Sequence, residues 1–121
     1  MDRQEFIKLL PYANPEVTIK DLDRTVVRSI TASDNLNPNR APGHYNLDIC
    51  KEECAELIQE LSKETRGIGD HYNILQELAD VIICARTAQI ICNISDDELK
   101  RAIHVKLMRL EDSINRNGYH Q

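Results

Sequence analysis

Two short acidic patterns are the residues of this sequence best suited to chemistry. Glu52, Glu53 and Glu56 form the first pattern, and Glu77 and Asp80 form the second after twenty intervening residues (57–76). Carboxylates three residues apart lie on the same side of a helix, with Cβ atoms about 5 to 6 Å apart. Acids this close repel one another unless protons or cations neutralise them. Because carboxylate oxygens suit hard cations, the patterns indicate a site for magnesium, with manganese as the alternative.

The helical periodicity around the two patterns predicts that they face each other. We expect helices over residues 47–65 and 70–92, each with an apolar stripe along one side. The stripes consist of Leu47, Cys50, Cys54, Leu57, Ile58 and Leu61 in the first helix, and Ile74, Leu75, Leu78, Val81, Ile82 and Ala85 in the second. At about 100° per residue, both acidic pairs fall at about −100° and −160° from the centre of their own stripe. Two antiparallel helices sharing one core would therefore bring the acids together.

Two helices are expected before the acidic patterns. Residues 2–10 form a short helical segment that Pro11 stops. A longer helix is expected over residues 18–30, where Thr18 and Asp21 have the spacing of a capping pair. Neither segment carries a recognisable catalytic pattern.

A long loop and a final helix complete the expected fold. Residues 31–46 are rich in Asn, Pro and Gly, which predicts a loop, and long loops in compact domains are often functional. Ser95 and Glu98 form a capping box that begins the last helix, which Asn117-Gly118 ends. Strand-like alternation is absent from the sequence, so we expect an all-α protein: a bundle of four main helices plus a short N-terminal helix.

Length and charge limit the classes of function. The 121 residues predict a single domain (1–121), with residues 1–46 holding the N-terminal helices and the loop, and 47–116 the motif-bearing helices. The net charge of −5 disfavours binding to polymeric nucleic acid, so any bound phosphate would be met locally by a metal and a few cations. A small phosphorylated ligand is the class that remains.

Location and assembly follow from the apolar residues and the cysteines. The sequence contains no apolar run long enough to span a bilayer and no signal peptide, and its four cysteines lie in helical patterns. We therefore expect a cytoplasmic protein with reduced thiols and no membrane partner. The segment 70–92 is apolar on most sides, which indicates burial in a bundle or between subunits. A homodimer or homotetramer is expected.

The acidic patterns resemble the signature of a known family. Glu52-Glu53-x-x-Glu56 followed by Glu77-x-x-Asp80 is similar to that of the all-α NTP pyrophosphohydrolases, the MazG-like group. The similarity covers about residues 47–116 and includes the segments Leu57-Ile58-x-x-Leu61-Ser62-Lys63, Ala79-Asp80-Val81-Ile82 and Lys106-Leu107-Met108-Arg109-Leu110.

The resemblance implies an activity and a set of site residues. A nucleoside or deoxynucleoside triphosphate would be hydrolysed to the monophosphate and pyrophosphate with magnesium, in a house-cleaning role for the nucleotide pool. The metal ligands implied are Glu53, Glu56, Glu77 and Asp80. Glu52 is the candidate general base, and the sequence leaves open whether Glu52 or Glu56 accepts the proton. The candidate phosphate-binding cations are Lys63, Lys106 and Arg109.

Several other interpretations compete with this one. Acid-rich helices are often simply solvated, although Asp80, a poor helix former, is unusual in so apolar a segment. A di-iron bundle would need a Glu-x-x-His motif that neither pair provides. A zinc site built from the four cysteines is disfavoured because Cys50 and Cys54 belong to the apolar stripe.

Two alternatives concern function itself. The chain could be a helical interaction or regulatory module without catalysis, or an enzyme similar to phosphoribosyl-ATP pyrophosphohydrolase. The sequence also leaves open which nucleobase of the substrate is preferred. Residues 18–46, which would complete the substrate pocket, match no known pattern. Tyr119 near the end of the chain is more typical of packing than of ligand binding.

Overall fold

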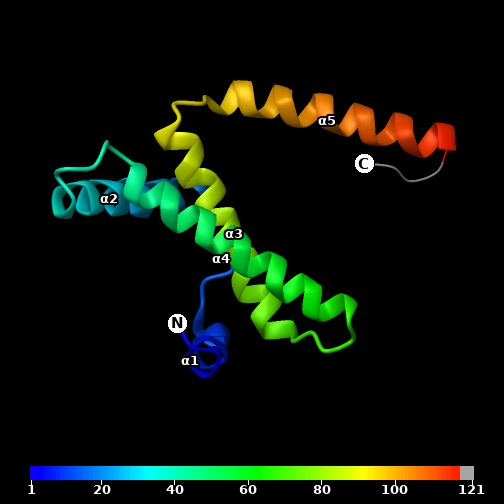
Figure 1. Cartoon of the computed structure of the whole chain (residues 1–121), viewed down its shortest axis with the longest axis horizontal. Coiled ribbons are helices and arrows are strands. Elements are labelled where there is room, and N and C mark those ends of the chain that lie inside the picture. Colours follow the sequence, from blue (N-terminus) through cyan, green and yellow to red (C-terminus); the bar gives the residue numbers. More distant parts are fainter. Residues whose placement is uncertain (118–121) are drawn as a thin grey trace. The chain divides into compact units, whose positions relative to one another are not determined.

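The structure, a computed structural model, describes residues 1–117 and confirms the expected all-α class. Those residues contain helices and connecting segments but no strand. The elements in chain order are α1 (Arg3–Leu9), a 3₁₀ turn (Leu10–Tyr12), α2 (Ile19–Leu36), α3 (His44–Thr65), α4 (His71–Ile91) and α5 (Asp96–Asn117), shown in Figure 1. None of these helices combines the length and the apolar character needed to cross a membrane.

The chain divides into two compact units. The first runs from Met1 to Ile91 and contains α1 to α4, and the second begins at Cys92 and contains α5. Asn93, in the left-handed conformation (φ 58°), lies between α4 and α5. Ser95 then accepts a hydrogen bond from the Glu98 backbone N–H (3.1 Å), the cap expected at the start of the last helix. That both units belong to one domain and one bundle stays a prediction.

Helices α3 and α4 form an antiparallel hairpin, the most extensive helix pairing of the first unit (Figure 1). The turn between them contains Gly67 in the left-handed conformation (φ 79°), which a glycine adopts without steric cost. The Ile68 backbone N–H donates to the Lys63 carbonyl (3.0 Å) and closes the end of α3. Asp70 accepts the Asn73 backbone N–H (2.9 Å) and caps the start of α4. Local sequence therefore determines where the hairpin turns.

The loop before the hairpin is shorter than the sequence predicted. We expected residues 31–46 to be irregular, but α2 continues to Leu36 and α3 begins at His44. The polar residues after Ile30 remain helical because no proline or glycine interrupts α2 before Pro38. Pro38 then disfavours the helical conformation at Asn37, the residue before it, so α2 ends at Leu36. The Asn37 side chain then donates to the Ser33 carbonyl (2.8 Å) and satisfies one of the last carbonyl groups of α2.

The small core of the first unit lies between α2, α3 and α4. Val26, Cys50 and Cys84 are its buried apolar residues, one from each helix. The predicted apolar stripes are only partly used: Ile58 is 65% exposed and Ile82 is 64% exposed. The hairpin interface lies on the side of Cys50, Cys84 and the acids rather than on the side of Ile58 and Ile82, so an apolar surface stays open on α3 and α4.

Candidate metal centre

The α3–α4 hairpin brings acids from both patterns into one cluster. Carboxylate oxygens of Glu53, Glu56 and Glu77 all lie within 4.8 Å of one another. A hydrogen bond close to the cluster shows how α3 and α4 are aligned: the Cys50 thiol of α3 donates to the Cys84 carbonyl oxygen of α4 at 3.4 Å. Cys50 is three residues before Glu53, so the cluster lies about one turn along the hairpin from this contact. The convergence of the acidic pairs on facing helices is therefore a feature of the fold.

The pKa values of two acids reflect this crowding. The pKa of Glu53 is raised to about 7, first by burial and then by the neighbouring charges of Asp80 and Glu56. Burial also raises the pKa of Glu77, followed by the charges of Glu56 and Asp80. Asp80 therefore interacts electrostatically with both residues, although its oxygens are outside the group of three. The cluster favours bound protons or a cation near neutral pH.

Two oxygens of the cluster lack hydrogen-bond donors. Glu53 Oε2 and Glu77 Oε2 are buried and have no hydrogen-bond partner among the described residues. A buried polar atom without a partner is costly, so these oxygens provide places for a bound cation. Magnesium binds oxygens at about 2.1 Å in octahedral geometry, so at least two of the three oxygen pairs would have to draw in to about 3 Å to hold one ion. The all-oxygen donor set is of the kind that magnesium prefers, and binding of this metal stays a prediction.

Competing metals find less support in the first unit. Within residues 1–117, Glu53, Glu56 and Glu77 make the one group of three or more His, Cys, Asp or Glu side chains close enough to share an ion. It contains neither histidine nor cysteine, the ligands preferred by zinc. All four cysteines are free, with Cys50 and Cys84 buried. The zinc alternative is therefore disfavoured by the arrangement of the side chains.

The other predicted site residues occupy different places. Glu52 is exposed on α3 beside Glu53 and outside the group of three acids. Lys63 is half-exposed, and its Nζ lies 3.3 Å from Glu60 Oε1. Lys106 and Arg109 lie one turn apart on the exposed surface of α5, in the second unit. Contact of these three cations with phosphate, and the role of Glu52 as base, stay predictions; Tyr119 lies outside the described residues.

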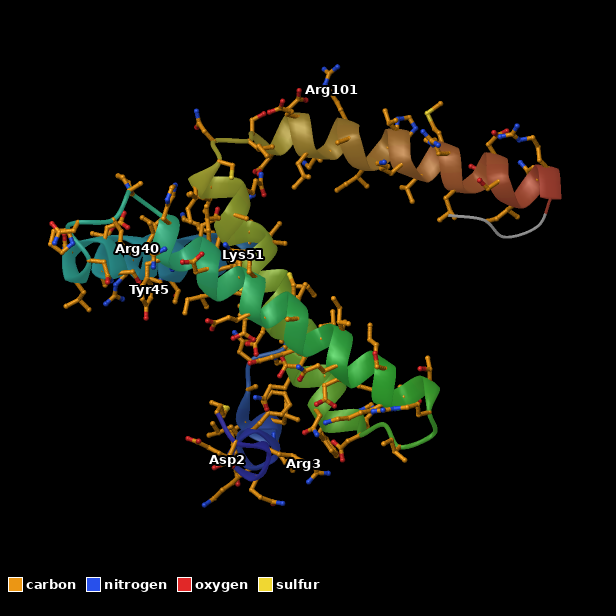
Figure 2. All side chains as sticks on the ribbon, in the orientation of Figure 1. Asp2, Arg3, Arg40, Tyr45, Lys51 and Arg101 are labelled. Carbon is orange, nitrogen blue, oxygen red and sulfur yellow. The ribbon has the colours of Figure 1, made fainter. Side chains whose placement is uncertain are left out.

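A groove of about 660 Å³ runs along the N-terminal half of α3. Its apolar floor includes Leu47, Cys54 and Ile58, and Arg40 and Lys51 lie on its rim. Figure 2 shows Arg40, Tyr45 and Lys51 gathered at this end of the hairpin. Both cations of the rim are used within the protein, because each forms an ion pair with Asp48.

The pKa of Asp48 agrees with these ion pairs. It is lowered to about 2, first by the hydrogen bond from Arg40 and then by the one from Lys51. Apart from these charged residues, the lining of the groove is mostly apolar, which suits an apolar partner better than a nucleotide.

The sequence reasoning missed two polar features of the hairpin. Glu60 is almost buried, and its Oε2 has no partner among the described residues. Arg86 of α4 forms an ion pair with Asp23 of α2. Helical periodicity does place Glu60 on the same side of the helix as Glu53 and Glu56, but it does not show that the side chain is buried. Arg86 could have been found as the one charged residue between 81 and 92.

Comparisons with known proteins identify no relative of this chain. No protein-family model, curated protein or solved structure matches this chain.

Proposed function

We propose that this chain is a magnesium-dependent nucleoside triphosphate pyrophosphohydrolase of the MazG-like kind. It would hydrolyse an NTP or dNTP between the α and β phosphates and release the monophosphate and pyrophosphate. The observation that carries the proposal is the convergence of Glu53, Glu56 and Glu77 within 4.8 Å, with two buried carboxylate oxygens that lack donors. Asp80, whose charge acts on Glu53, is the fourth acid of the proposed metal-binding set.

The roles of the residues follow from their positions. Magnesium, when bound, would neutralise phosphoryl charge and lower the pKa of a water molecule. The four acids would hold the cation, and they must lose their protons to do so. Because the pKa of Glu53 is about 7, this residue still carries a proton in part of the molecules at neutral pH and releases it when the cation binds. Glu52 is exposed and next to the cluster in sequence, so it is available as the base, with Glu56 as the alternative.

An oligomer belongs to the same proposal. Ile58, Leu78 and Ile82 are 65%, 43% and 64% exposed on the hairpin that carries the acids, and the groove floor adds further apolar surface. Apolar surface in this amount commonly marks a protein interface. A second hairpin from another copy would cover it and complete a four-helix bundle, in a homodimer or a homotetramer. A cytoplasmic location, where the four free cysteines stay reduced, completes the proposal.

Hydrolysis of defined nucleotides tests the activity. The protein is incubated with magnesium and a panel of NTPs, dNTPs and phosphoribosyl-ATP, and the products are identified by ³¹P NMR. We expect a monophosphate and pyrophosphate, and we expect Glu53→Gln and Asp80→Asn to lower the rate by about 100-fold or more. Glu64→Gln is the matched control, because Glu64 is an exposed acid of the same helix outside the cluster.

Three results would count against the proposal. Release of inorganic phosphate without pyrophosphate would place the cleaved bond elsewhere. Unchanged hydrolysis in Glu53→Gln and Asp80→Asn would reject the metal site. Absence of hydrolysis across the panel would favour an interaction module that has the helices without the activity.

A further inference from the structure

Glu60 continues the row of acids along α3 and is turned inward. It lies four residues after Glu56, which is about 6 Å along the helix axis. Its side chain is only 14% exposed, and its Oε2 is buried with no partner among the described residues. The carboxylate therefore faces the protein rather than solvent. No part of the sequence signature includes this residue.

Lys63 is held by the inward-turned carboxylate. Its Nζ lies 3.3 Å from Glu60 Oε1, and its side chain is 44% exposed. A lysine on an exposed helix loses conformational entropy when its ammonium group is fixed, and pairs of this kind contribute little to stability. The contact matters more for where it places a positive charge: beside the acidic row, one turn beyond Glu56.

The position of that charge matches one end of the proposed substrate. The metal cluster would hold the reacting phosphates, and Glu60, whose Oε1 lies beside the Lys63 ammonium group, is about 6 Å along α3 from Glu56, which is similar to the length of a diphosphate group. An ammonium group at that distance can donate hydrogen bonds to phosphate oxygens while the acids hold the cation. Lys63 is the one cation between residues 52 and 65 of this helix, so it has no replacement there.

We propose that Glu60 is a positioning residue that holds the Lys63 ammonium group where it meets the pyrophosphate portion of the triphosphate. This inference rests on the proposed function, and it adds a residue outside the acidic signature. Glu60 makes no contact with the substrate in this scheme; it acts through Lys63. The pair would therefore affect affinity for pyrophosphate more than affinity for the metal alone.

Calorimetric binding of inorganic pyrophosphate in magnesium tests the role of the pair without requiring turnover. We expect Lys63→Met and Glu60→Ala each to weaken pyrophosphate binding by about 10-fold, and the double variant to be no weaker than either single variant. Magnesium binding without pyrophosphate should change by less than about twofold. Lys63→Arg should restore part of the affinity, because it keeps the charge.

Control variants separate positioning from folding. Lys51→Met removes a cation of the same helix that is paired with Asp48, and it should bind pyrophosphate like the unmodified protein. Glu60→Gln keeps the shape of the side chain and serves if Glu60→Ala unfolds, as judged by circular dichroism. Unchanged pyrophosphate binding in the folded Glu60 variants, or additive losses in the double variant, would overturn the inference.

The result is independent of the hydrolysis assay. Coupled losses of pyrophosphate binding in a protein that hydrolyses no nucleotide would support the Glu60–Lys63 role and reject the proposed enzyme. Hydrolysis with unaltered pyrophosphate binding in the Glu60 variants would support the enzyme and reject the role of Glu60. In an active protein, we also expect KM for the triphosphate to rise about 10-fold in Glu60→Gln, with a smaller change in kcat.

Discussion

Arg86 of α4 binds the carboxylate of Asp23 on α2 through two parallel hydrogen bonds. The Nε–Oδ1 distance is 2.6 Å and the Nη2–Oδ2 distance is 2.8 Å. Arg86 Nη1 also donates to Gln89 Oε1 at 2.8 Å, and the arginine side chain is only 17% exposed. A bidentate pair of this kind fixes the orientation as well as the distance of its partners. It joins α2 to the helix that carries Glu77 and Asp80.

Removing Arg86 should therefore destabilise the first unit. We expect Arg86→Met to lower the free energy of unfolding by about 1–3 kcal/mol, because Asp23 would lose its bidentate hydrogen bonds in a partly buried place. Arg86→Lys should recover only part of this, since lysine cannot form the bidentate contact. Urea unfolding followed by circular dichroism measures the change.

The matched control for Arg86 is an exposed pair on α5. Arg101 binds Asp97 at 2.8 Å, but the two side chains are 80% and 77% exposed. Arg101→Met should change the unfolding free energy by less than about 0.5 kcal/mol. Equal effects of Arg86→Met and Arg101→Met would contradict the structural role of the α2–α4 contact.

The stability of the metal-free protein should fall as the pH rises from about 4.5 to 7. The pKa of Glu53 goes from 4.5 in the unfolded chain to about 7 in the folded protein, so the folded state binds more protons in this window. Glu77 acts in the same direction, because its pKa is also raised. We expect a loss of about 1–3 kcal/mol between pH 5 and pH 8, measured by urea unfolding in EDTA.

Glu53→Gln should flatten this pH dependence and make the metal-free protein more stable at pH 8. Other shifted acids do not mask the effect: the pKa values of Asp21, Asp48 and Asp70 are lowered from 3.8, so they act below this window. Glu64→Gln, an exposed acid of the same helix, is the control. A protein that becomes more stable between pH 5 and pH 8 would refute the crowding of the acids.

Magnesium should stabilise the protein, and more strongly at pH 8 than at pH 6. At the lower pH, protons on Glu53 compete with the cation, whereas at pH 8 the carboxylates are free to bind it. At 100 times the dissociation constant, the gain should be about 2.7 kcal/mol. Thermal unfolding with magnesium, and then with excess EDTA, measures it. The Asp80→Asn variant should lose most of the stabilisation by magnesium. Equal stabilisation of this variant and the unmodified protein would place the cation elsewhere.

Two glycines with the same backbone conformation should differ in their tolerance of a side chain. Gly43 (φ 80°) and Gly67 (φ 79°) are both left-handed, but a Cβ at Gly43 would lie 2.6 Å from Ile91 Cγ2, whereas one at Gly67 meets nothing within 4 Å. Gly67→Ala should cost about 1 kcal/mol, from the backbone alone. Gly43→Ala should cost about 1–3 kcal/mol more, because Ile91 must move. Similar melting temperatures for the two variants would rule out close packing of the α2–α3 loop on α4.

Sequence reasoning worked best where the signal is local. The caps at Thr18 and Ser95 each depend on a few neighbouring residues, and both are confirmed. The meeting of Glu53 and Glu56 with Glu77 was also predictable, because two helices joined by a short turn must pack side by side.

Features that depend on tertiary packing were harder to predict. Periodicity located the apolar stripes but not the rotation of each helix, so Ile58 and Ile82 are open where a core was expected. Periodicity shows which side of a helix is apolar, but it does not show which other helix or subunit packs against that side. The inward turn of Glu60 and the pairing of Arg86 with Asp23 depend on contacts that spacing does not encode.

The short turn between α3 and α4 also affects the order in which the protein forms. From Glu53 to Asp80 the acids of the proposed centre span 28 residues, and contacts over so short a separation form quickly. These contacts lie within the hairpin alone and need no part of α5 (Asp96–Asn117). The carboxylates therefore meet early in folding, and a divalent cation that binds them would hold α3 against α4 before the contacts of longer sequence separation have formed.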